Sequence, residues 1–298
     1  MNIKYVSMRF PHPPLWGMMR RVAPERKENR SVDIDLFKIR SLLFLPASNP
    51  RAIEKARSAG SDLVILDLED AVRPADKDAA RDAAVEAIAS QWGMPVAVRV
   101  NGFGSAWHEL DLAAVAGSAV DAIIVPDVRQ PEHLDPIRAP GGRLVIAMIE
   151  SAQGVLAAPS IAKRASALMV GTNDLANDLR LSRSSGRAGL QFALQSVVLA
   201  ARAAGIPVFD GVFNALEDED GFAAECGQGR ALGFDGKSLI HPRQIATCHA
   251  VFSASTDEIA RAKRLVAAAT GGAERFEGEM IEQMHVDAAK RLIEQTLR

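Results

Sequence analysis

From residue 41 onward, short apolar runs alternate with longer amphipathic, alanine-rich stretches. Runs of four or five apolar residues are typical of strands buried on both faces of a parallel sheet. The eight predicted strands, the last of them short, are residues 41–45, 63–66, 96–100, 122–125, 145–149, 166–170, 206–209 and 233–236.

The stretches between these strands carry helix start and stop signals. Asn49 or Ser48 stands before the first stretch and Gly60 after it, as expected of a helix N-cap and a C-terminal stop. Eight strand–helix units of about 25 residues predict a (β/α)8 TIM barrel. An open dinucleotide-binding sheet would need a glycine-rich turn after its first strand, and residues 46–50 (PASNP) do not provide one.

Segments of different character flank the repeating pattern. Residues 1–39 are rich in arginine and proline and form a predicted N-terminal extension, residues 40–254 form the predicted barrel, and residues 255–298 form a predicted helical tail. In the tail we expect helices over residues 256–269 and 285–297, joined by a flexible, charged hinge. The last helix has an apolar stripe, which must be buried against another surface. The stripe consists of Val286, Ala289, Leu292 and Ile293.

Composition narrows the class of protein. Hydrophobic residues make up 48% of the 298 residues, enough for a sizeable core. A net charge of −2 and 5% aromatic residues argue against nucleic-acid binding. No apolar run reaches transmembrane length, so no membrane association is expected. Cys226 and Cys248 lack CxxC spacing and are typical of free thiols in a reducing, cytoplasmic location.

Acidic side chains follow most of the predicted strands, at the barrel end where active sites lie. They are Asp67, Glu69, Asp70, Asp127, Glu150, Asp174, Asp210 and Asp235, accompanied by Arg99 and Lys237. Glu150 and Asp174 end neighbouring strands one repeat apart, so both could hold one Mg²⁺, which needs only one or two protein carboxylates. The alternative, that both are helix N-caps facing water, stays open.

Arg99 is the cation best placed among these strand-end acids. Its planar fork of donors could bind a substrate carboxylate with two hydrogen bonds. The alternative is a structural ion pair with Glu69 or Glu150, because ion-pair networks often imitate functional sites.

At these residues the chain resembles the citrate lyase β-subunit-like branch of the HpcH/HpaI aldolase family. No single motif is specific, but their order along the chain is. The matching segments are residues 40–46 (RSLLFLP), 66–72 (LDLEDAV), Lys77 with Ala80 and Arg81, 98–102 (VRVNG), 147–152 (AMIESA), Gly171 with Asp174 and Leu175, 233–237 (GFDGK) and 240–242 (IHP).

The resemblance implies a barrel of the phosphoenolpyruvate/pyruvate type and a role for each matching residue. Glu150 and Asp174 would hold Mg²⁺, and Arg99 with Glu150 would contact the substrate. Glu69 and Asp70, together with Asp67, would orient metal-bound water. The implied reaction is carbon–carbon cleavage of a 3-hydroxy-dicarboxyl thioester, on CoA or an acyl carrier, into an acetyl-type thioester and an α-oxo acid. The implied assembly is a homo-oligomer, a trimer or hexamer, and the resemblance suggests that the apolar stripe of the last helix packs across its interface.

Three positions depart from the family pattern. Asp127 stands where many relatives have lysine, and Ser238 where relatives often have a bulkier residue. Glu282 stands where CoA lyases carry a lid aspartate, often supplied by a neighbouring subunit. Its longer side chain could preserve or break an acid/base role. Two other functions therefore stay open: hydrolysis of the same thioester, and a non-catalytic or complex-bound lyase subunit.

Overall fold

The computed structural model describes residues 34–137 and 143–296, without the side chains of residues 183–185. The chain divides into two compact units, Met1–Val32 and Asp33–Arg298. The first unit lies outside the described residues, so the predicted N-terminal extension stays a prediction there. The second unit contains the barrel and the tail.

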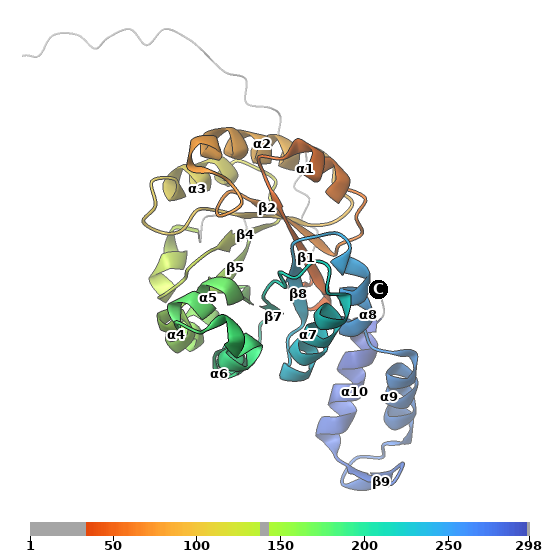
Figure 1. The fold of residues 1–298 in the computed structure, drawn as a ribbon. Helices are drawn as coiled ribbons and strands as arrows, with labels where there is room; N and C mark the ends of the chain where they lie inside the picture. Colours follow the sequence, from red (N-terminus) through yellow and green to blue (C-terminus); the bar gives the residue numbers. More distant parts are fainter. Residues whose placement is uncertain (1–33, 138–142, 297–298) are drawn as a thin grey trace, which may run out of the picture. The chain divides into compact units, whose positions relative to one another are not determined.

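Eight parallel strands form a closed barrel in sequence order, with β1 paired to β8 (Figure 1). This confirms the predicted fold class. The strands are β1 Ser41–Pro46, β2 Leu63–Asp67, β3 Val96–Arg99, β4 Ala122–Val125, β5 Leu144–Ile149, β6 Ala167–Val170, β7 Val208–Asp210 and β8 Gly236–Leu239.

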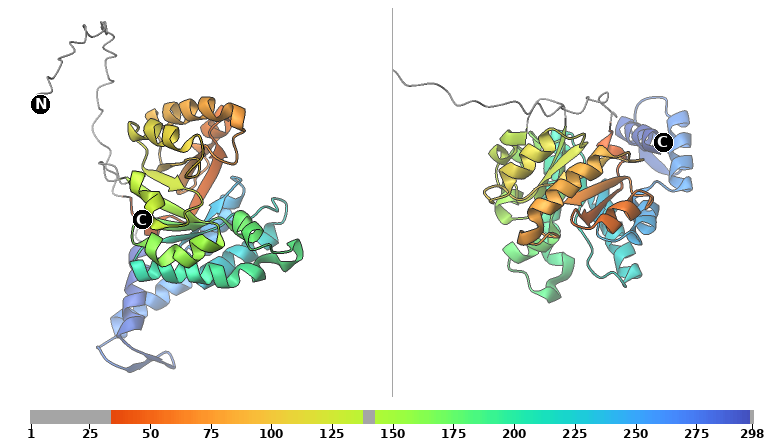
Figure 2. Two further views of the ribbon diagram at one scale, coloured as in Figure 1. Left: turned by 90° about the vertical axis from the view of Figure 1, so that its left-hand side faces the viewer. Right: turned by 90° about the horizontal axis from the view of Figure 1, so that it is seen from above.

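Helices lie outside the strands and cover the barrel (Figure 2). They are α1 Pro50–Ala56, α2 Lys77–Ala89, α3 His108–Ala116, α4 Ala152–Ala162, α5 Thr172–Asp178, α6 Gln191–Ala204, α7 Glu219–Leu232 and α8 Gln244–Phe252. Short 3-10 helices are η1 Leu36–Lys38, η2 Pro74–Asp76, η3 Pro131–Ile137 and η4 Arg183–Leu190. In the described part of the β4–β5 connection the helical element is η3, in which Pro136 cannot donate the backbone hydrogen bond that an α-helix would need. The predicted cap is confirmed: the Asn49 side chain accepts the N–H of Ala52 at the start of α1.

The predicted position of the eighth strand was wrong. Residues 233–236 were expected as the strand, but β8 begins only at Gly236. Gly233 has φ of 98° and caps the end of α7 in the left-handed region, where glycine is favoured. The strand escaped recognition because Lys237 and Ser238, both fully buried, interrupt its apolar pattern.

Two hydrophobic layers fix which way each strand residue points. The inner layer fills the barrel and contains Leu63, Ile65 and Ala97, together with Leu36 and Ile39 from the segment before β1. The outer layer lies between strands and helices. Since strand side chains alternate, Asp67 and Arg99 follow the inner layer, whereas Asp210 and Lys237 follow the outer one.

The tail forms a small assembly with its own core. It comprises α9 Thr256–Ala268, the hairpin strands β9 Glu274–Phe276 and β10 Glu279–Ile281, and α10 Gln283–Thr296. Two expectations were therefore wrong. The charged linker forms a hairpin instead of a hinge, and its glutamates pair with Arg261 and Arg264. The apolar stripe of the last helix packs against α9 and β10 of the same chain.

Candidate active site

Arg99 and Asp67 form the base of the candidate site. They are directly paired residues of β3 and β2, so both side chains project from the inner face at the carboxyl end of the strands. Arg99 Nε and Nη2 donate to the two Asp67 oxygens at 2.7 and 2.6 Å. The Phe44 ring lies 4.9 Å from the Arg99 guanidinium carbon. The two oxygens also accept the N–H groups of Glu69 and Ala71. Asp67 therefore orients Arg99 and the following loop.

Glu69 and Asp70 approach the same guanidinium from the loop after β2. Arg99 Nη1 lies 2.7 Å from Glu69 Oε2, in an ion pair without hydrogen-bond geometry, and 3.8 Å from Asp70 Oδ2. Burial raises the pKa of Glu69 to about 8, and the neighbouring Asp70, Glu150 and Asp67 add to the effect against the opposing charge of Arg99. The ion-pair alternative for Arg99 is thus present in the structure, with Glu69 as one of its partners.

Glu150 follows β5 and is only 6% exposed. One carboxylate oxygen, Oε1, accepts the backbone N–H of Asp127 at 2.6 Å, whereas Oε2 is buried without a hydrogen bond. Burial raises the pKa of Glu150 to about 7, while Arg99 and the Asp127 N–H oppose the rise and Asp174 adds to it. A buried acceptor without a partner is costly unless another group satisfies it.

Asp174 lies in the first turn of α5, after β6. Burial raises its pKa, and Asp70 and Asp127 add to the effect, so this carboxylate shares the field of the others. The N-cap positions belong to Gly171 for α5 and Ser151 for α4. Neither Glu150 nor Asp174 is therefore a helix N-cap, and the alternative based on caps does not describe this site.

We refer to Arg99, Asp67, Glu69, Asp70, Glu150 and Asp174 as the carboxylate site. Its excess of acids and the unpartnered Glu150 Oε2 fit a hard divalent cation, which prefers oxygen ligands. Within residues 34–137 and 143–296, no group of three or more His, Cys, Asp or Glu side chains is arranged to hold a metal ion. A cation would thus depend on Glu150 and Asp174 plus water and substrate, as Mg²⁺ sites often do.

Two residues that match the family pattern have supporting roles that were not predicted from the sequence. A Cβ atom on Gly171 would lie 2.1 Å from Glu150 Oε2, so only glycine leaves room for this carboxylate. Lys77, buried on α2, donates to the carbonyl oxygens of Leu68 and Glu69 and to Asn101 Oδ1 at 2.6–2.8 Å. Lys77 lies in a segment that resembles the family, but nothing in its spacing reveals that it anchors the loop carrying Glu69.

Other predicted strand-end residues do not join the carboxylate site. Asp210 and Lys237 are cross-strand neighbours that face outward, where they pair with each other, with Arg187 and with Glu225. We call these four residues the outer ion-pair cluster. Asp235 precedes β8, and its carboxylate accepts the N–H of Val208 at the start of β7. All three were expected at the active end, and the misplaced eighth strand explains the error for Asp235.

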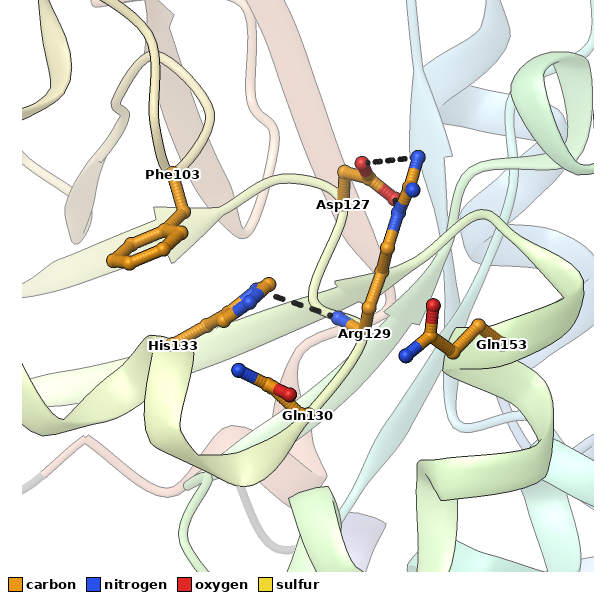
Figure 3. A pocket seen from close by; sticks show the side chains of 6 residues that line it. All are labelled: Phe103, Asp127, Arg129, Gln130, His133 and Gln153. Atoms are coloured by element: carbon orange, nitrogen blue, oxygen red, sulfur yellow. Dashed lines mark hydrogen bonds and ion pairs between the residues drawn. The ribbon is translucent and has the colours of Figure 1, made fainter.

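A rim cavity of about 360 Å³ adjoins the carboxylate site through Asp127 (Figure 3). Its other lining residues are Phe103, Arg129, Gln130, His133 and Gln153. The Phe103 and His133 rings stack with centroids 4.5 Å apart. Arg129 pairs with the Asp127 carboxylate through Nε at 2.9 Å and Nη2 at 2.8 Å.

Glu282 lies between β10 and α10 in the tail. Its backbone N–H donates to His285 Nδ1. Across the part of the chain that the structure describes, no hydrogen bond or ion pair joins its side chain to the carboxylate site. Its predicted lid role stays a prediction.

The chain is similar in sequence to proteins named (3S)-malyl-CoA thioesterase and citrate lyase subunit beta. It is 41% identical over 265 residues to the (3S)-malyl-CoA thioesterase of Cereibacter sphaeroides, covering 85% of this chain and 93% of the relative. It is 35% identical over 278 residues to the citrate lyase β subunit of Haemophilus influenzae, covering 86% and 96%.

A solved structure has the same fold and a bound metal. The CitE protein of Mycobacterium tuberculosis, in complex with magnesium, acetoacetate and coenzyme A, superposes with a TM-score of 0.78. It is 32% identical, and the match covers 88% of this chain and 100% of that one. The family model described as HpcH/HpaI aldolase/citrate lyase matches residues 40–242, which contain every residue of the carboxylate site. The chain therefore belongs to the HpcH/HpaI aldolase/citrate lyase family.

Proposed function

We propose that the protein is a Mg²⁺-dependent carbon–carbon lyase acting on a 3-hydroxy-dicarboxyl thioester of the malyl-, citramalyl- or citryl-CoA type. The observation that carries this proposal is the unpartnered, buried Glu150 Oε2 beside Asp174 and Arg99. The magnesium and coenzyme A in the CitE relative support both the metal and the thioester.

Glu150 and Asp174 would hold the cation at the carboxyl end of β5 and β6. When bound, Mg²⁺ would act as a Lewis acid toward the oxygen atoms of the α-oxo acid part of the substrate. Arg99 would bind the substrate carboxylate through Nη1, the donor that now faces Glu69 without a hydrogen bond. Asp67 keeps the other two donors in place, so Arg99 presents a fixed charge to the substrate.

The chemistry requires the chain to move two protons. A carboxylate, for which Glu69 and Asp70 are the candidates, takes the proton of the substrate hydroxyl group. The bond between the carbinol carbon and the α carbon then breaks. The carbinol carbon becomes the carbonyl of the α-oxo acid, and the electron pair remains as a thioester enolate. Protonation of that enolate gives the acetyl-type thioester, and Glu282 from a neighbouring copy is the candidate acid.

Hydrolysis of the same thioester is the second candidate function. It is favoured by the 41% identity to a (3S)-malyl-CoA thioesterase. In this reaction water adds to the thioester carbonyl and CoA leaves as the thiol, while the carbon–carbon bond stays intact. A third candidate, a subunit active only within a complex, follows from the similarity to citrate lyase β subunits.

Product analysis distinguishes the three functions. The purified full-length chain is incubated with malyl-, citramalyl- or citryl-CoA and Mg²⁺, and products are identified by mass spectrometry. Acetyl-CoA with an α-oxo acid supports the lyase, whereas free CoA with the intact hydroxy acid supports hydrolysis. If neither product forms until acyl-carrier and partner subunits are added, the isolated chain is not the catalyst. The Glu150→Gln variant is the control for a contaminating enzyme.

A further inference from the structure

Asp127 has an unusual backbone conformation next to the carboxylate site. Its φ is 45°, one of three positive values among the described residues other than glycine, with Arg180 and Glu277. Residues with a Cβ rarely adopt this left-handed region, although aspartate and asparagine tolerate it better than most. Such conformations persist only where surrounding contacts hold them, and they often occur at functional sites.

Hydrogen bonds toward β5 explain this conformation. The N–H of Asp127 points to Glu150 Oε1, and the next N–H, of Val128, points to the carbonyl oxygen of Met148. In an extended strand, successive N–H groups point in opposite directions. Two consecutive donors can face the same strand only if the chain bends between them, as in a bulge. The positive φ of Asp127 is therefore coupled to its hydrogen bond with Glu150.

Glu150 is thereby confined from two sides. The Asp127 N–H fixes Oε1, and the missing side chain of Gly171 leaves room for Oε2. Oε2 remains without a hydrogen bond and is free for a ligand. The Arg129 fork holds the Asp127 side chain from the rim cavity (Figure 3). This ion pair is 39–49% exposed, so we expect it to add little by itself.

We propose that Asp127 is a positioning residue, whose left-handed backbone aims its N–H at Glu150 and so fixes the orientation in which Glu150 receives the metal. The part of this inference that concerns the metal rests on the proposed function. The part that concerns the position of Glu150 does not. The role belongs to the backbone, so the side chain at position 127 matters through the conformations it permits. It predicts that glycine and asparagine will substitute for aspartate and that a β-branched residue will not.

The test compares Asp127→Gly, Asp127→Asn, Asp127→Ala and Asp127→Val. Glycine adopts positive φ freely and asparagine tolerates it, alanine resists it, and valine resists it most. We expect Mg²⁺ affinity by calorimetry to stay within about threefold of wild type for glycine and asparagine. For valine we expect a loss of about tenfold or more, equivalent to about 1.4 kcal/mol, with alanine between. If the valine variant does not fold, the order of the other three decides.

Arg180→Val is the matched control, because Arg180 has φ of 54° but makes no described contact with Glu150. It should strain the backbone similarly and leave Mg²⁺ affinity within about threefold of wild type, as expected when a strained position does not contact the site. Equal affinity in all Asp127 variants, or a loss for glycine as large as for valine, would overturn the proposal.

Crystal structures of the metal-free variants separate this proposal from the proposed function. In the valine variant the Glu150 carboxylate should leave the backbone nitrogen of residue 127, and in the glycine variant it should stay. If the carboxylate moves as expected but Glu150→Gln binds Mg²⁺ like wild type, the positioning role stands and the metal assignment fails. If Glu150→Gln loses Mg²⁺ and the valine variant keeps Glu150 in place, the positioning role is wrong.

Discussion

Two groups of buried charge lie on opposite faces of the barrel wall, and they are built differently. Inside, Arg99 faces Asp67 across β2 and β3. Outside, Lys237 faces Asp210 across β7 and β8. Both pairs are cross-strand neighbours, so the same sheet geometry produces them. The difference lies in what surrounds each pair.

The outer ion-pair cluster balances its charges. Asp210 and Glu225 are matched by Lys237 and Arg187, with contacts of 2.7–3.4 Å. Asp210 and Lys237 are fully buried, so each needs the other. This charge-balanced network joins β7, β8, α7 and η4, and both of its acids are paired with cations.

The carboxylate site does not balance its charges. Its single arginine faces five acids, and burial among them raises the pKa of both Glu150 and Glu69. Glu150 also keeps one oxygen without a partner. The side chains of the carboxylate site do not neutralise this excess of negative charge. The excess therefore indicates a site that binds a cation or another ligand. The comparison predicts that removing charge destabilises the outer cluster and stabilises the inner one.

The largest effect is expected for Lys237→Met in the outer cluster. The change leaves Asp210 and Glu225 with one cation fewer in a buried place, which should lower the free energy of unfolding by about 3–5 kcal/mol. Chemical denaturation measures this loss, and Mg²⁺ affinity of the folded protein should be unchanged. Lys263→Met, on the exposed face of α9, is the control and should change stability by less than about 0.5 kcal/mol. A loss below about 1 kcal/mol for Lys237→Met would contradict a structural role.

The opposite sign is expected for Glu150→Gln. Removing an acid whose pKa is about 7 should leave the metal-free protein as stable or more stable, by up to about 2 kcal/mol above pH 7. Turnover should fall at least about a hundredfold, and Mg²⁺ affinity should fall with it. Asp174→Asn should lower turnover as Glu150→Gln does. Its gain in stability should be smaller, because Asp174 is more exposed than Glu150.

Glu86→Gln, on the exposed face of α2, is the matched control for charge removal and should change none of these measurements. Wild-type Mg²⁺ affinity in both Glu150→Gln and Asp174→Asn would exclude these carboxylates as the metal ligands.

The third expectation concerns pH and metal removal. With pKa values of about 7 and about 8, Glu150 and Glu69 hold protons in the folded metal-free protein that the unfolded chain has already released. Stability is therefore highest at low pH in this window and falls as pH rises through these values. Between about pH 6 and pH 8 the metal-free protein should lose about 3–4 kcal/mol.

Calorimetric melting with EDTA or with Mg²⁺ checks this expectation. Because a cation binds the ionised carboxylates, Mg²⁺ should raise the melting temperature more at about pH 8 than at about pH 6. Asp62, whose pKa is lowered mainly by its hydrogen bonds to Arg40 against the effect of burial, loses its contribution only below the ordinary pKa of aspartate and so does not interfere. If the metal-free protein became less stable as the pH was lowered from about 8 to about 6, the carboxylate site would not contain an excess of buried negative charge.

The sequence allowed most of the architecture to be predicted and less of the site. β4 was predicted to the residue because Ala122–Val125 is apolar throughout. β8 was misplaced because Lys237 is buried through its ion pairs with Asp210 and Glu225, and a single sequence does not show which residues pair. The tail stripe was recognised, but its partner was wrong, because periodicity shows that a face is buried and not what buries it.

Within the site, residue types were easier to predict than contacts. The acids at the strand ends and Arg99 were identified, yet the Asp67 partner of Arg99 depends on strand register. Gly171 and Asp127 act through backbone geometry, the first by a missing Cβ and the second by a positive φ. Neither property can be seen in spacing or charge, since it arises only when the chain is closed into a barrel.

The smallest effect is expected for Arg99→Lys, which tests whether this cation serves the substrate or only its ion pairs. Lysine keeps the charge but loses the fork that now reaches both Asp67 oxygens and Glu69. If Arg99 binds the substrate carboxylate, kcat/KM should fall about tenfold, a loss of about 1.4 kcal/mol, while Mg²⁺ affinity stays near wild type. Arg230→Lys is the control, because Arg230 makes one exposed pair with Glu258 and lies on α7, away from the carboxylate site. An unchanged kcat/KM with a lowered melting temperature would show that Arg99, like Lys237, only neutralises buried acids.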